Sequence, residues 1–207
     1  HSGTGWVPGD WDGTCRELRA AGVTDVFPNL LWPAQAHFPS DVVPISYTAR
    51  THGDQAAAVL AAARRHGLRV HPWKVCWNLE GLPEAELQQL RKAGALQARA
   101  DGQLVAWLNP AVPANAEREL AAITNAAARY PFDGIHLDYI RWPGRDADYS
   151  PATRRAFETA LGRTIARWPA DVLNGGPLAA EFRRWRANVI SEFVRRVRTE
   201  LRRVAPT

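Results

Sequence analysis

The hydrophobic and polar positions along the chain alternate between two patterns. In several long segments apolar residues recur every three to four positions, which predicts amphipathic helices. Between these segments lie shorter and mostly apolar runs, which predict buried strands. Helices are predicted over 10–22, 54–67, 83–94, 113–130, 150–168 and from about Glu181 to the end. Strands are predicted over 23–32, 68–78 and 132–143, and 98–110 is predicted to form a hairpin with an Asp-Gly turn.

The element boundaries carry capping signals. Asp10 and Ser150 are the residue types that cap helix amino termini, and Pro83 stands in a first turn. Gly22 and Gly67 follow helices and are typical of their ends.

Strands that alternate with helices predict βαβ units and a parallel sheet. The two architectures considered are a closed (β/α)8 barrel and an open doubly wound sheet. No Gly-rich phosphate loop follows a strand, which disfavours a nucleotide-binding sheet. We therefore predict an α/β fold of the TIM barrel type. Only three strands and a hairpin are predicted where a complete barrel has eight strands, so we expect 1–207 to be a single domain forming the amino-terminal part of a barrel that lacks its first strand and its later βα units.

Composition adds a basic charge and few cysteines. The net charge is +5 with a pI near 9.8, which raises the possibility of an anionic polymer as partner. We expect most arginines to lie on solvated helix faces and expect no nucleic-acid binding. No run approaches the roughly 20 apolar residues of a membrane span, and no signal peptide is visible. The absence of Met means that His1 is not a translation start, so we expect a processed product or a piece of a longer protein.

The two cysteines do not predict a metal site. Cys15 and Cys76 are too few for a zinc site, which needs about four ligands, and two buried thiols are expected rather than a disulfide. The residues require no metal and no cofactor.

The segment FDGIHLDYIRWP, residues 132–143, holds the leading catalytic candidate. Along a strand successive side chains point to opposite faces. Ile135 and Leu137 should therefore face the helix layer, while His136 and Asp138 should point into the barrel. Functional groups of parallel α/β folds gather at the carboxyl ends of strands. We predict that Asp138 is catalytic, and the alternative is a structural carboxylate paired with an arginine. Asp133 is predicted to be a turn or cap residue.

Other polar and aromatic residues at strand ends are candidates for substrate contact. His71 is either a core histidine or a ligand-binding one, and Asn78 and Asn109 are either turn residues or hydrogen-bond partners of sugars. Tryptophans near strand ends (Trp32, Trp73, Trp77 and Trp142) would offer flat faces to sugar rings, although core packing is the alternative for each. The predicted substrate-binding residues are His71, Trp73, Asn78, Asn109, His136, Tyr139, Arg141 and Trp142.

Five motifs in order resemble a known family. They are LRAAGVTDVFPNLLWPAQAHFPSDVVP, AAARRHGLRVHPWKVCWN, WLNPAVP, FDGIHLDYIRWP and WRANVISEFVRRVRTEL. This order is similar to that of the glycosyl-hydrolase-like family 10 proteins, which are bacterial, mostly exported barrel proteins with a YngK-like domain. The resemblance implies glycoside hydrolysis of a polysaccharide, with bacterial cell-wall glycan strands as substrate. It also implies an exported protein, whether periplasmic, cell-envelope or secreted.

The chain departs from related patterns beside Asp138. The family often has a second acidic residue where Tyr139 stands. Family 18 chitinases carry a similar strand, and Ile140 occupies the position of their proton-donating Glu. Glycoside hydrolysis usually needs two carboxyl groups. We therefore expect the second from a loop or from the absent strands, with Glu80, Asp146 and Glu181 as the loop candidates. The alternative function is a carbohydrate-binding barrel without catalysis. The sequence does not identify the glycosidic linkage of the substrate or the number of subunits in the protein.

Overall fold

A computed structural model describes residues 3–144 and 146–205 of the chain. The chain divides into two compact units, which are described separately. Unit 1 comprises His1–Cys76, Glu119–Asp138 and Glu200–Thr207, and unit 2 comprises Trp77–Arg118 and Tyr139–Thr199.

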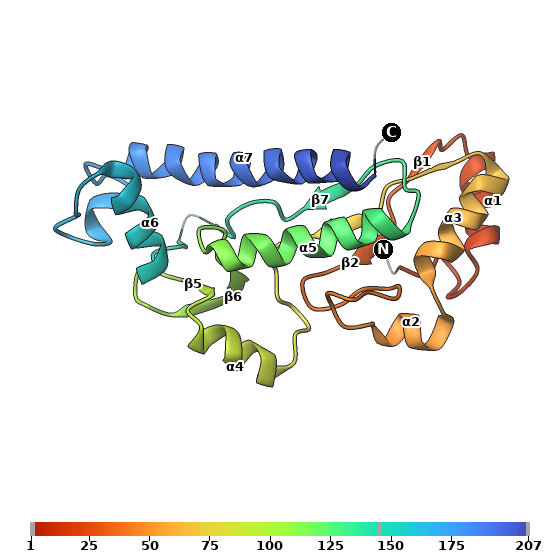
Figure 1. The fold of residues 1–207 in the computed structure, drawn as a ribbon, viewed down its shortest axis with the longest axis horizontal. Coiled ribbons are helices and arrows are strands. Elements are labelled where there is room, and N and C mark those ends of the chain that lie inside the picture. The colour runs from red at the N-terminus through yellow and green to blue at the C-terminus, as the bar shows by residue number, and fades with distance from the viewer. Residues whose placement is uncertain (1–2, 145, 206–207) are drawn as a thin grey trace. The chain divides into compact units, whose positions relative to one another are not determined.

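Unit 1 consists of helices and short parallel strands (Figure 1). Its elements are α1 (Trp11–Ala20), β1 (Asp25–Val26), β2 (Asn29–Leu31), α2 (Tyr47–His52), α3 (Gln55–His66), β3 (Arg69–Val70), β4 (Trp73–Val75), most of α5 (Pro113–Arg129) and β7 (His136–Asp138). The predicted caps Asp10, Ser150 and Gly67 are confirmed, whereas Pro83 is the residue that precedes the helix Glu84–Lys92 and does not lie in its first turn. The Asp10 carboxylate accepts a hydrogen bond from Gly13 N at 2.8 Å, and Gly67 ends α3 in the left-handed conformation with φ of 65°.

The strands of unit 1 are shorter than predicted, and proline explains two of the interruptions. The run 23–32 forms β1 and β2, separated at Pro28, and the run 68–78 forms β3 and β4, separated at Pro72. Proline has no N–H to donate to a strand ladder. The segment 132–143 forms only β7. The predicted parallel pairing is confirmed, since β1 pairs with β3 and the order β2-β4-β7 is parallel throughout.

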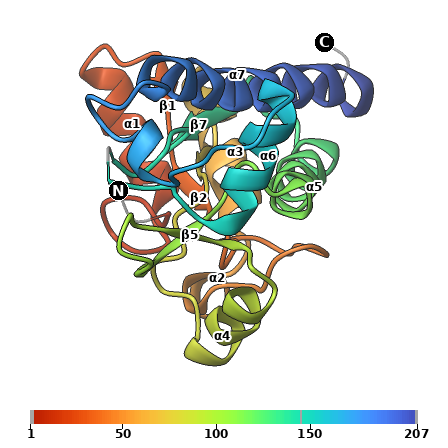
Figure 2. The same ribbon diagram turned by 90° about the vertical axis from the view of Figure 1, so that its left-hand side faces the viewer.

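The core of unit 1 lies between the sheet and its helices. The small apolar residues of α3 let it pack closely beside α1, and the two helices are neighbours in Figure 1. Figure 2 gives the same ribbon turned by 90°. Cys15 is fully buried in this core, and Cys76 is also buried and free, as predicted. Burial raises the pKa of Cys15 to about 11 and that of Cys76 to about 12, so both stay as thiols at neutral pH.

An ion pair fixes α5 against one face of the sheet. Lys74 Nζ of β4 lies 2.7 Å from Glu119 Oε2 of α5, and neither side chain is exposed to solvent. Removal of one partner of such a pair strongly destabilises the fold, because the other charge is left buried and unpaired. The face of β4 that carries Lys74 is therefore the helix-covered one.

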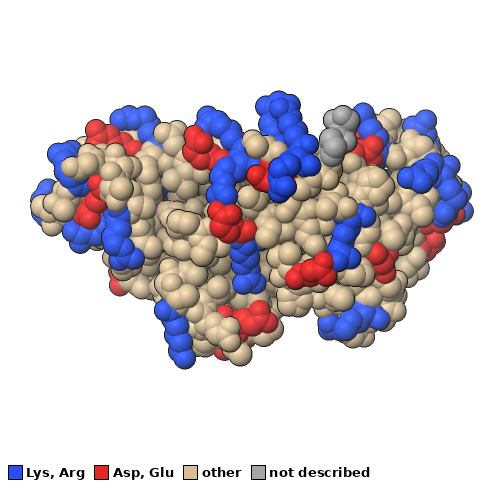
Figure 3. All heavy atoms as spheres, in the orientation of Figure 1, with Lys and Arg blue, Asp and Glu red and all other residues tan. Residues whose placement is uncertain are grey.

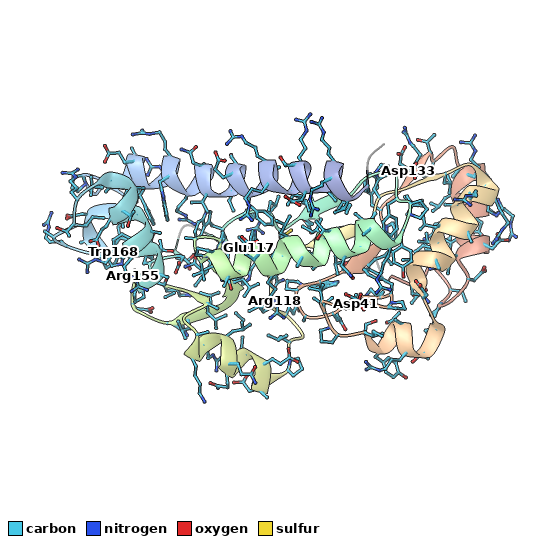
Figure 4. The ribbon with its side chains drawn as sticks, viewed as in Figure 1. Asp41, Glu117, Arg118, Asp133, Arg155 and Trp168 are labelled. Carbon is cyan, nitrogen blue, oxygen red and sulfur yellow. The ribbon has the colours of Figure 1, made fainter. Side chains whose placement is uncertain are left out.

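Unit 2 contains the predicted hairpin and the remaining helices. Its elements are α4 (Glu84–Lys92), β5 (Leu96–Ala98), β6 (Leu104–Leu108), the first turns of α5, α6 (Pro151–Leu161), the 3-10 turn η1 (Ala170–Val172) and most of α7 (Ala179–Val204). Strands β5 and β6 are antiparallel, which confirms the hairpin. Helix α6 ends seven residues before the predicted limit because Gly162 takes the left-handed conformation with φ of 68°. The chain then folds back, and Trp168 (Figure 4) donates from Nε1 to Tyr149 O at 2.9 Å.

Helix α7 is amphipathic, as predicted. Its buried apolar residues include Phe182, Phe193 and Val197. Its arginines are mostly exposed, and Figure 3 shows basic atoms along the edge of the molecule where α7 lies, with carboxylates among them. This mixture fits a solvated helix face.

The described strands form one three-stranded and two two-stranded sheets. The α/β class is confirmed, and no closed barrel is present within residues 3–144 and 146–205. None of the helices in these residues combines the length and apolar character needed to cross a bilayer. The same residues contain no group of His, Cys, Asp and Glu arranged to hold a metal ion.

Candidate functional site

The strands β4 and β7 of unit 1 present one open face. Trp73 is in register with His136, and Val75 with Asp138. Residues in register on parallel strands point to the same side of the sheet. Lys74 points to the opposite side, where it meets α5. The predicted alternation in β7 is therefore confirmed, with His136 and Asp138 on the face away from α5.

Asp138 is held by a tryptophan. Trp73 Nε1 donates to Asp138 Oδ2 at 3.0 Å, and both side chains are half-buried. In the part of the chain that the structure describes, Asp138 makes no ion pair, so the alternative of a structural carboxylate paired with arginine finds no partner there. Its Oδ1 accepts no hydrogen bond from those residues and remains open to a ligand or to solvent.

An unbroken row of rings continues from Asp138 along this face. His136 packs edge-on against Trp73, with ring centroids 5.5 Å apart, and against Phe27 at 5.4 Å. Phe27 in turn stacks on His71 at 5.0 Å. Phe27 is 49% exposed, and His136 is exposed as well, which is unusual for a packed core. The row offers both flat ring faces and polar ring atoms.

Asp25 ends the row. His71 Nε2 lies 2.9 Å from Asp25 Oδ1, and Arg69 Nε lies 2.7 Å from the same oxygen. The hydrogen bond from Arg69, followed by those from Thr24 and His71, holds the pKa of Asp25 well below its ordinary value. Asp25 is therefore an ionised group that orients His71. His71 is half-buried, with 21% of its side chain exposed, so part of its ring is accessible.

The turn before β7 is shaped around His71. A Cβ on Gly134 would lie 2.7 Å from His71 Nδ1, so only glycine fits there without a shift. Asp133 (Figure 4) accepts a hydrogen bond from Val70 N at 2.8 Å, as a turn residue would. The DGIH segment thus joins β7 to β3 and leaves space for the imidazole.

A second aromatic group lies in unit 2. Tyr139 follows Asp138 in the chain and packs against Trp107 with ring centroids 5.3 Å apart. The Arg141 guanidinium lies over both rings, 5.1 Å from the Tyr139 centroid and 5.6 Å from that of Trp107. Tyr139 has a φ of 52°, which bulky residues seldom adopt and which concentrates at functional sites. Trp107 was not among the predicted residues because it lies inside a hairpin strand.

The family of the chain follows from its sequence as a whole. A model of the family described as glycosyl hydrolase-like 10 matches residues 14–207. The chain belongs to the glycosyl hydrolase-like 10 family. A curated relative of this glycosyl hydrolase-like 10 chain is an S-layer-related protein of Niallia circulans. It is 31% identical over an alignment of 104 residues, which covers 45% of this chain and 6% of the relative.

Solved structures similar to this glycosyl hydrolase-like 10 chain are carbohydrate-active enzymes at low identity. Alpha-L-fucosidase isoenzyme 2 from Paenibacillus thiaminolyticus matches with a TM-score of 0.56 and 16% identity, over 99% of this chain and 28% of that one. The PgaB (BpsB) glycoside hydrolase domain from Bordetella bronchiseptica matches at 0.57 and 15%, over 83% and 47%. Beta-galactosidase from the psychrophilic Marinomonas ef1 matches at 0.65 and 13%, over 100% and 35%. At these identities the matches establish the fold, and the chain spans less than half of each matched structure.

Two asparagines predicted to bind substrate in this glycosyl hydrolase-like 10 domain have structural contacts. Asn109 is fully buried, and its Nδ2 donates to Asp148 Oδ2 at 2.6 Å. A side chain without exposed surface makes no substrate contact in this conformation, so we assign Asn109 a structural role. Asn78 is largely buried, and its Oδ1 accepts from Glu80 N at 3.0 Å, which is the turn role considered for it.

The tryptophans differ in accessibility. Trp77 is fully buried against Phe193, with ring centroids 4.7 Å apart, so it is a core residue. Trp142 is 9% exposed, donates to Arg186 O at 3.1 Å and lies under the Arg186 guanidinium. This exposure leaves little of its surface for the predicted role as a sugar platform. Trp73 and Trp32 are half-exposed.

The carboxylates considered as partners of Asp138 lie in unit 2. Glu80, Asp146 and Glu181 are all exposed, and Asp146 lies 3.5 Å from Arg99. None of the three lies in the buried, water-excluding setting that is typical of a proton-donating carboxyl group.

Proposed function

We propose that the chain is part of a glycoside hydrolase that acts on a polysaccharide, and that Asp138 is one of its catalytic carboxylates. The observation that carries the proposal is the setting of Asp138 at the end of β7. One of its oxygens is oriented by Trp73 Nε1, and the other is not engaged by the described residues. A carboxylate held in this way is aimed without being saturated, which suits a nucleophile or a general base.

The chemistry assigns different roles to the two aspartates of this face. Hydrolysis requires a carboxyl group that is protonated at working pH as well as an ionised one. Asp25 does not serve as the acid, because its contacts with Arg69 and His71 stabilise its charged form. Asp138 takes the ionised role, and the proton donor comes from another part of the protein.

Substrate contact is proposed for the partly or fully exposed rings beside Asp138. Trp73, His136 and His71 offer faces and ring nitrogens in unit 1, and sugar rings stack on such faces through their C–H surfaces. In unit 2, Tyr139 with Trp107 forms a second aromatic group, and Arg141, which lies over both rings, supplies hydrogen-bond donors.

The polymer is proposed to be a bacterial cell-wall glycan, with the protein exported to the cell envelope or beyond. The relative from Niallia circulans is described as S-layer-related, and S-layers belong to the outer cell surface. The chain spans 6% of that relative, so this location is part of the proposal.

A carbohydrate-binding domain without catalysis is the second candidate, and one observation favours it. The other carboxylates of unit 1 near this sheet have partners. Asp25 is paired with Arg69, Glu119 with Lys74, and Asp133 accepts from the backbone of β3. A binding surface needs no second carboxyl group, whereas hydrolysis does.

The test is hydrolysis of purified cell-wall glycan strands by the whole protein that contains this chain. Asp138→Asn keeps the size of the side chain and removes its charge, and we expect the release of reducing ends to fall by at least about a thousandfold, the scale of losing a catalytic group. Asp101→Asn, at an exposed turn, is the matched control and should retain full activity.

A binding measurement with the same glycan strands distinguishes a glycoside hydrolase from a domain that binds carbohydrate without catalysis. Full activity of Asp138→Asn would remove Asp138 from the mechanism. Glycan binding by the wild type without any hydrolysis would support the second candidate.

A further inference from the structure

A pocket in unit 2 is lined by two arginines. It has a volume of about 360 Å³ and lies between the first turns of α7, the loop before α6 and the segment after η1. Its walls include Gly144, Tyr149, Asn174, Phe182, Arg183 and Arg186. This volume is within the range of small-molecule sites, which is about 300–1,000 Å³.

Arg186 is fixed in the wall of this pocket. Its Nη2 donates to Gly144 O at 3.1 Å and to Ala147 O at 2.6 Å. Its guanidinium lies 4.7 Å from the centroid of Trp142 and 5.7 Å from that of Phe182. The group is therefore held in one orientation by two carbonyls and two rings.

The charge of Arg186 is not neutralised by direct contact. It makes no ion pair with any acidic residue in 3–144 or 146–205. Burial lowers the pKa of Arg186, and the nearby Asp148 carboxylate opposes this effect without contacting the guanidinium. Both Asp148 oxygens are occupied, since its Oδ1 accepts from Ala98 N and Ser150 N and its Oδ2 from side chains. A largely desolvated cation without a contacting anion is costly, and an anion in the pocket would relieve that cost.

Arg183 adds a second positive charge. It stands three residues before Arg186 on α7, so both side chains project from the same side of the helix. It is exposed and makes no ion pair with the described acidic residues. Two guanidiniums with Asn174 beside them match the geometry of a carboxylate, which accepts several donors at once.

We infer that this pocket binds the carboxylate-bearing sugar of an acidic glycan. The two arginines face the carboxylate, Asn174 offers a hydrogen bond to a hydroxyl, and the aromatic side chains of Tyr149 and Phe182 form an apolar wall for the ring. The volume leaves room for a sugar ring in addition to its acidic group. The choice of a sugar rests on the proposed function, whereas the choice of an anion rests on the arginines alone.

The test is isothermal titration of the whole protein at low salt with three probes. D-glucuronate carries both a ring and a carboxylate, D-glucose has the ring alone, and inorganic phosphate is an anion without a ring. We expect glucuronate to bind, glucose to bind at least tenfold more weakly, and phosphate to bind more weakly than glucuronate.

Variants assign the binding to this pocket. Arg183→Gln is expected to weaken glucuronate binding at least fivefold, because one charge-assisted contact is lost. Arg184→Gln removes the same charge from the same helix at an exposed position outside the pocket, and its affinity should match that of the wild type. Arg186→Lys keeps the charge but loses the planar fork, and a larger loss is expected. If Arg186→Lys fails to fold, Arg183→Gln still decides the matter.

Three results would overturn the inference. They are equal binding of glucose and glucuronate, phosphate binding as tight as glucuronate binding, and equal losses in Arg183→Gln and Arg184→Gln. The readout is independent of hydrolysis, because Asp138→Asn should bind glucuronate normally. An inactive protein that binds glucuronate therefore contradicts the proposed function alone, and an active protein that does not bind it contradicts the pocket alone.

Discussion

Two aspartates, Asp138 in unit 1 and Asp148 in unit 2, occupy opposite kinds of environment. Asp138 is half-buried and receives one hydrogen bond, from an indole N–H. Asp148 is fully buried and accepts from Ala98 N, Asn109 Nδ2 and both the backbone and side chain of Ser150, with Thr153 Oγ1 completing the set. The first carboxylate has capacity left for a ligand, and the second has none.

The difference shows how to separate functional from structural carboxylates. A buried charge is tolerated when its donors saturate it, and removing it leaves those donors unsatisfied. A carboxylate that is oriented yet unsaturated contributes little to folding and is available for chemistry. Stability and activity should therefore respond in opposite ways to changes at the two positions.

The largest effect is expected from Asp148→Ala. The change leaves the donors of Ala98, Ser150 and Thr153 without this acceptor in a buried site, so the free energy of unfolding should fall by about 4 kcal/mol. Asn109 Nδ2 keeps Ser150 Oγ and Thr153 Oγ1 as acceptors. Urea unfolding followed by circular dichroism measures it. Asp138→Ala is the matched change and should lower the same quantity by about 1 kcal/mol or less. Similar losses at both positions would end the distinction between the two carboxylates.

The sequence indicated Asp138, the half-buried member of this pair, and missed Asp148, the fully buried one. Asp138 follows an apolar strand and stands out by alternation, whereas Asp148 lies in a polar loop without periodicity. Its donors come from β5, from the loop after β6 and from the start of α6, and only the tertiary fold brings them together. Asn109 was predicted as a possible sugar ligand for the same reason, because its partner is 39 residues away.

The fold was predictable where local chemistry decides it. Helix boundaries followed from caps such as Asp10, Ser150 and Gly67, and the hairpin followed from its Asp-Gly turn. Strand lengths were not predictable in the same way, because apolar periodicity continues across Pro28 and Pro72 while the hydrogen-bond ladder does not. The cluster of Trp107, Tyr139 and Arg141 joins a hairpin strand to a distant loop, and no local pattern indicates it.

A smaller effect is expected from Trp73→Phe, which sharpens the assignment of Asp138. The change keeps an aromatic ring and removes the N–H that donates to Asp138. The free energy of unfolding should fall by about 1 kcal/mol, the typical contribution of one hydrogen bond. If Trp73 positions Asp138, kcat on glycan strands should fall about tenfold while KM changes little, since about 1.4 kcal/mol of transition-state stabilisation corresponds to a factor of ten.

Trp6→Phe is the control for that experiment. Trp6 belongs to the same unit and is 61% exposed, so its replacement should change neither kcat nor stability measurably. A rise in KM without a fall in kcat for Trp73→Phe would indicate that Trp73 is a sugar platform. It would contradict the role of Trp73 in positioning Asp138.

The smallest effect is expected from Asp25→Asn, which tests an intermediate kind of carboxylate. Asp25 is neither saturated by neutral donors nor left open, because it is paired with Arg69 and His71. The hydrogen bond from Arg69 is the main cause that lowers the pKa of Asp25 in the folded state, below the unfolded value of about 3.9. The stability that this group adds is therefore present above pH of about 4 and is lost as the pH falls through the lower, folded-state pKa.

The wild type should be more stable than Asp25→Asn at pH 7, and the melting temperatures of the two proteins should converge as the pH is lowered toward 2. The other acidic groups are the same in both proteins, so their effects cancel in the difference between the two melting temperatures. Asp101→Asn is the control, and its melting temperature should follow that of the wild type across the pH range. A constant difference between wild type and Asp25→Asn across the acid range would show that the pairing with Arg69 does not stabilise the charged carboxylate, and Asp25 would then be free to act as a second acid on the same face as Asp138.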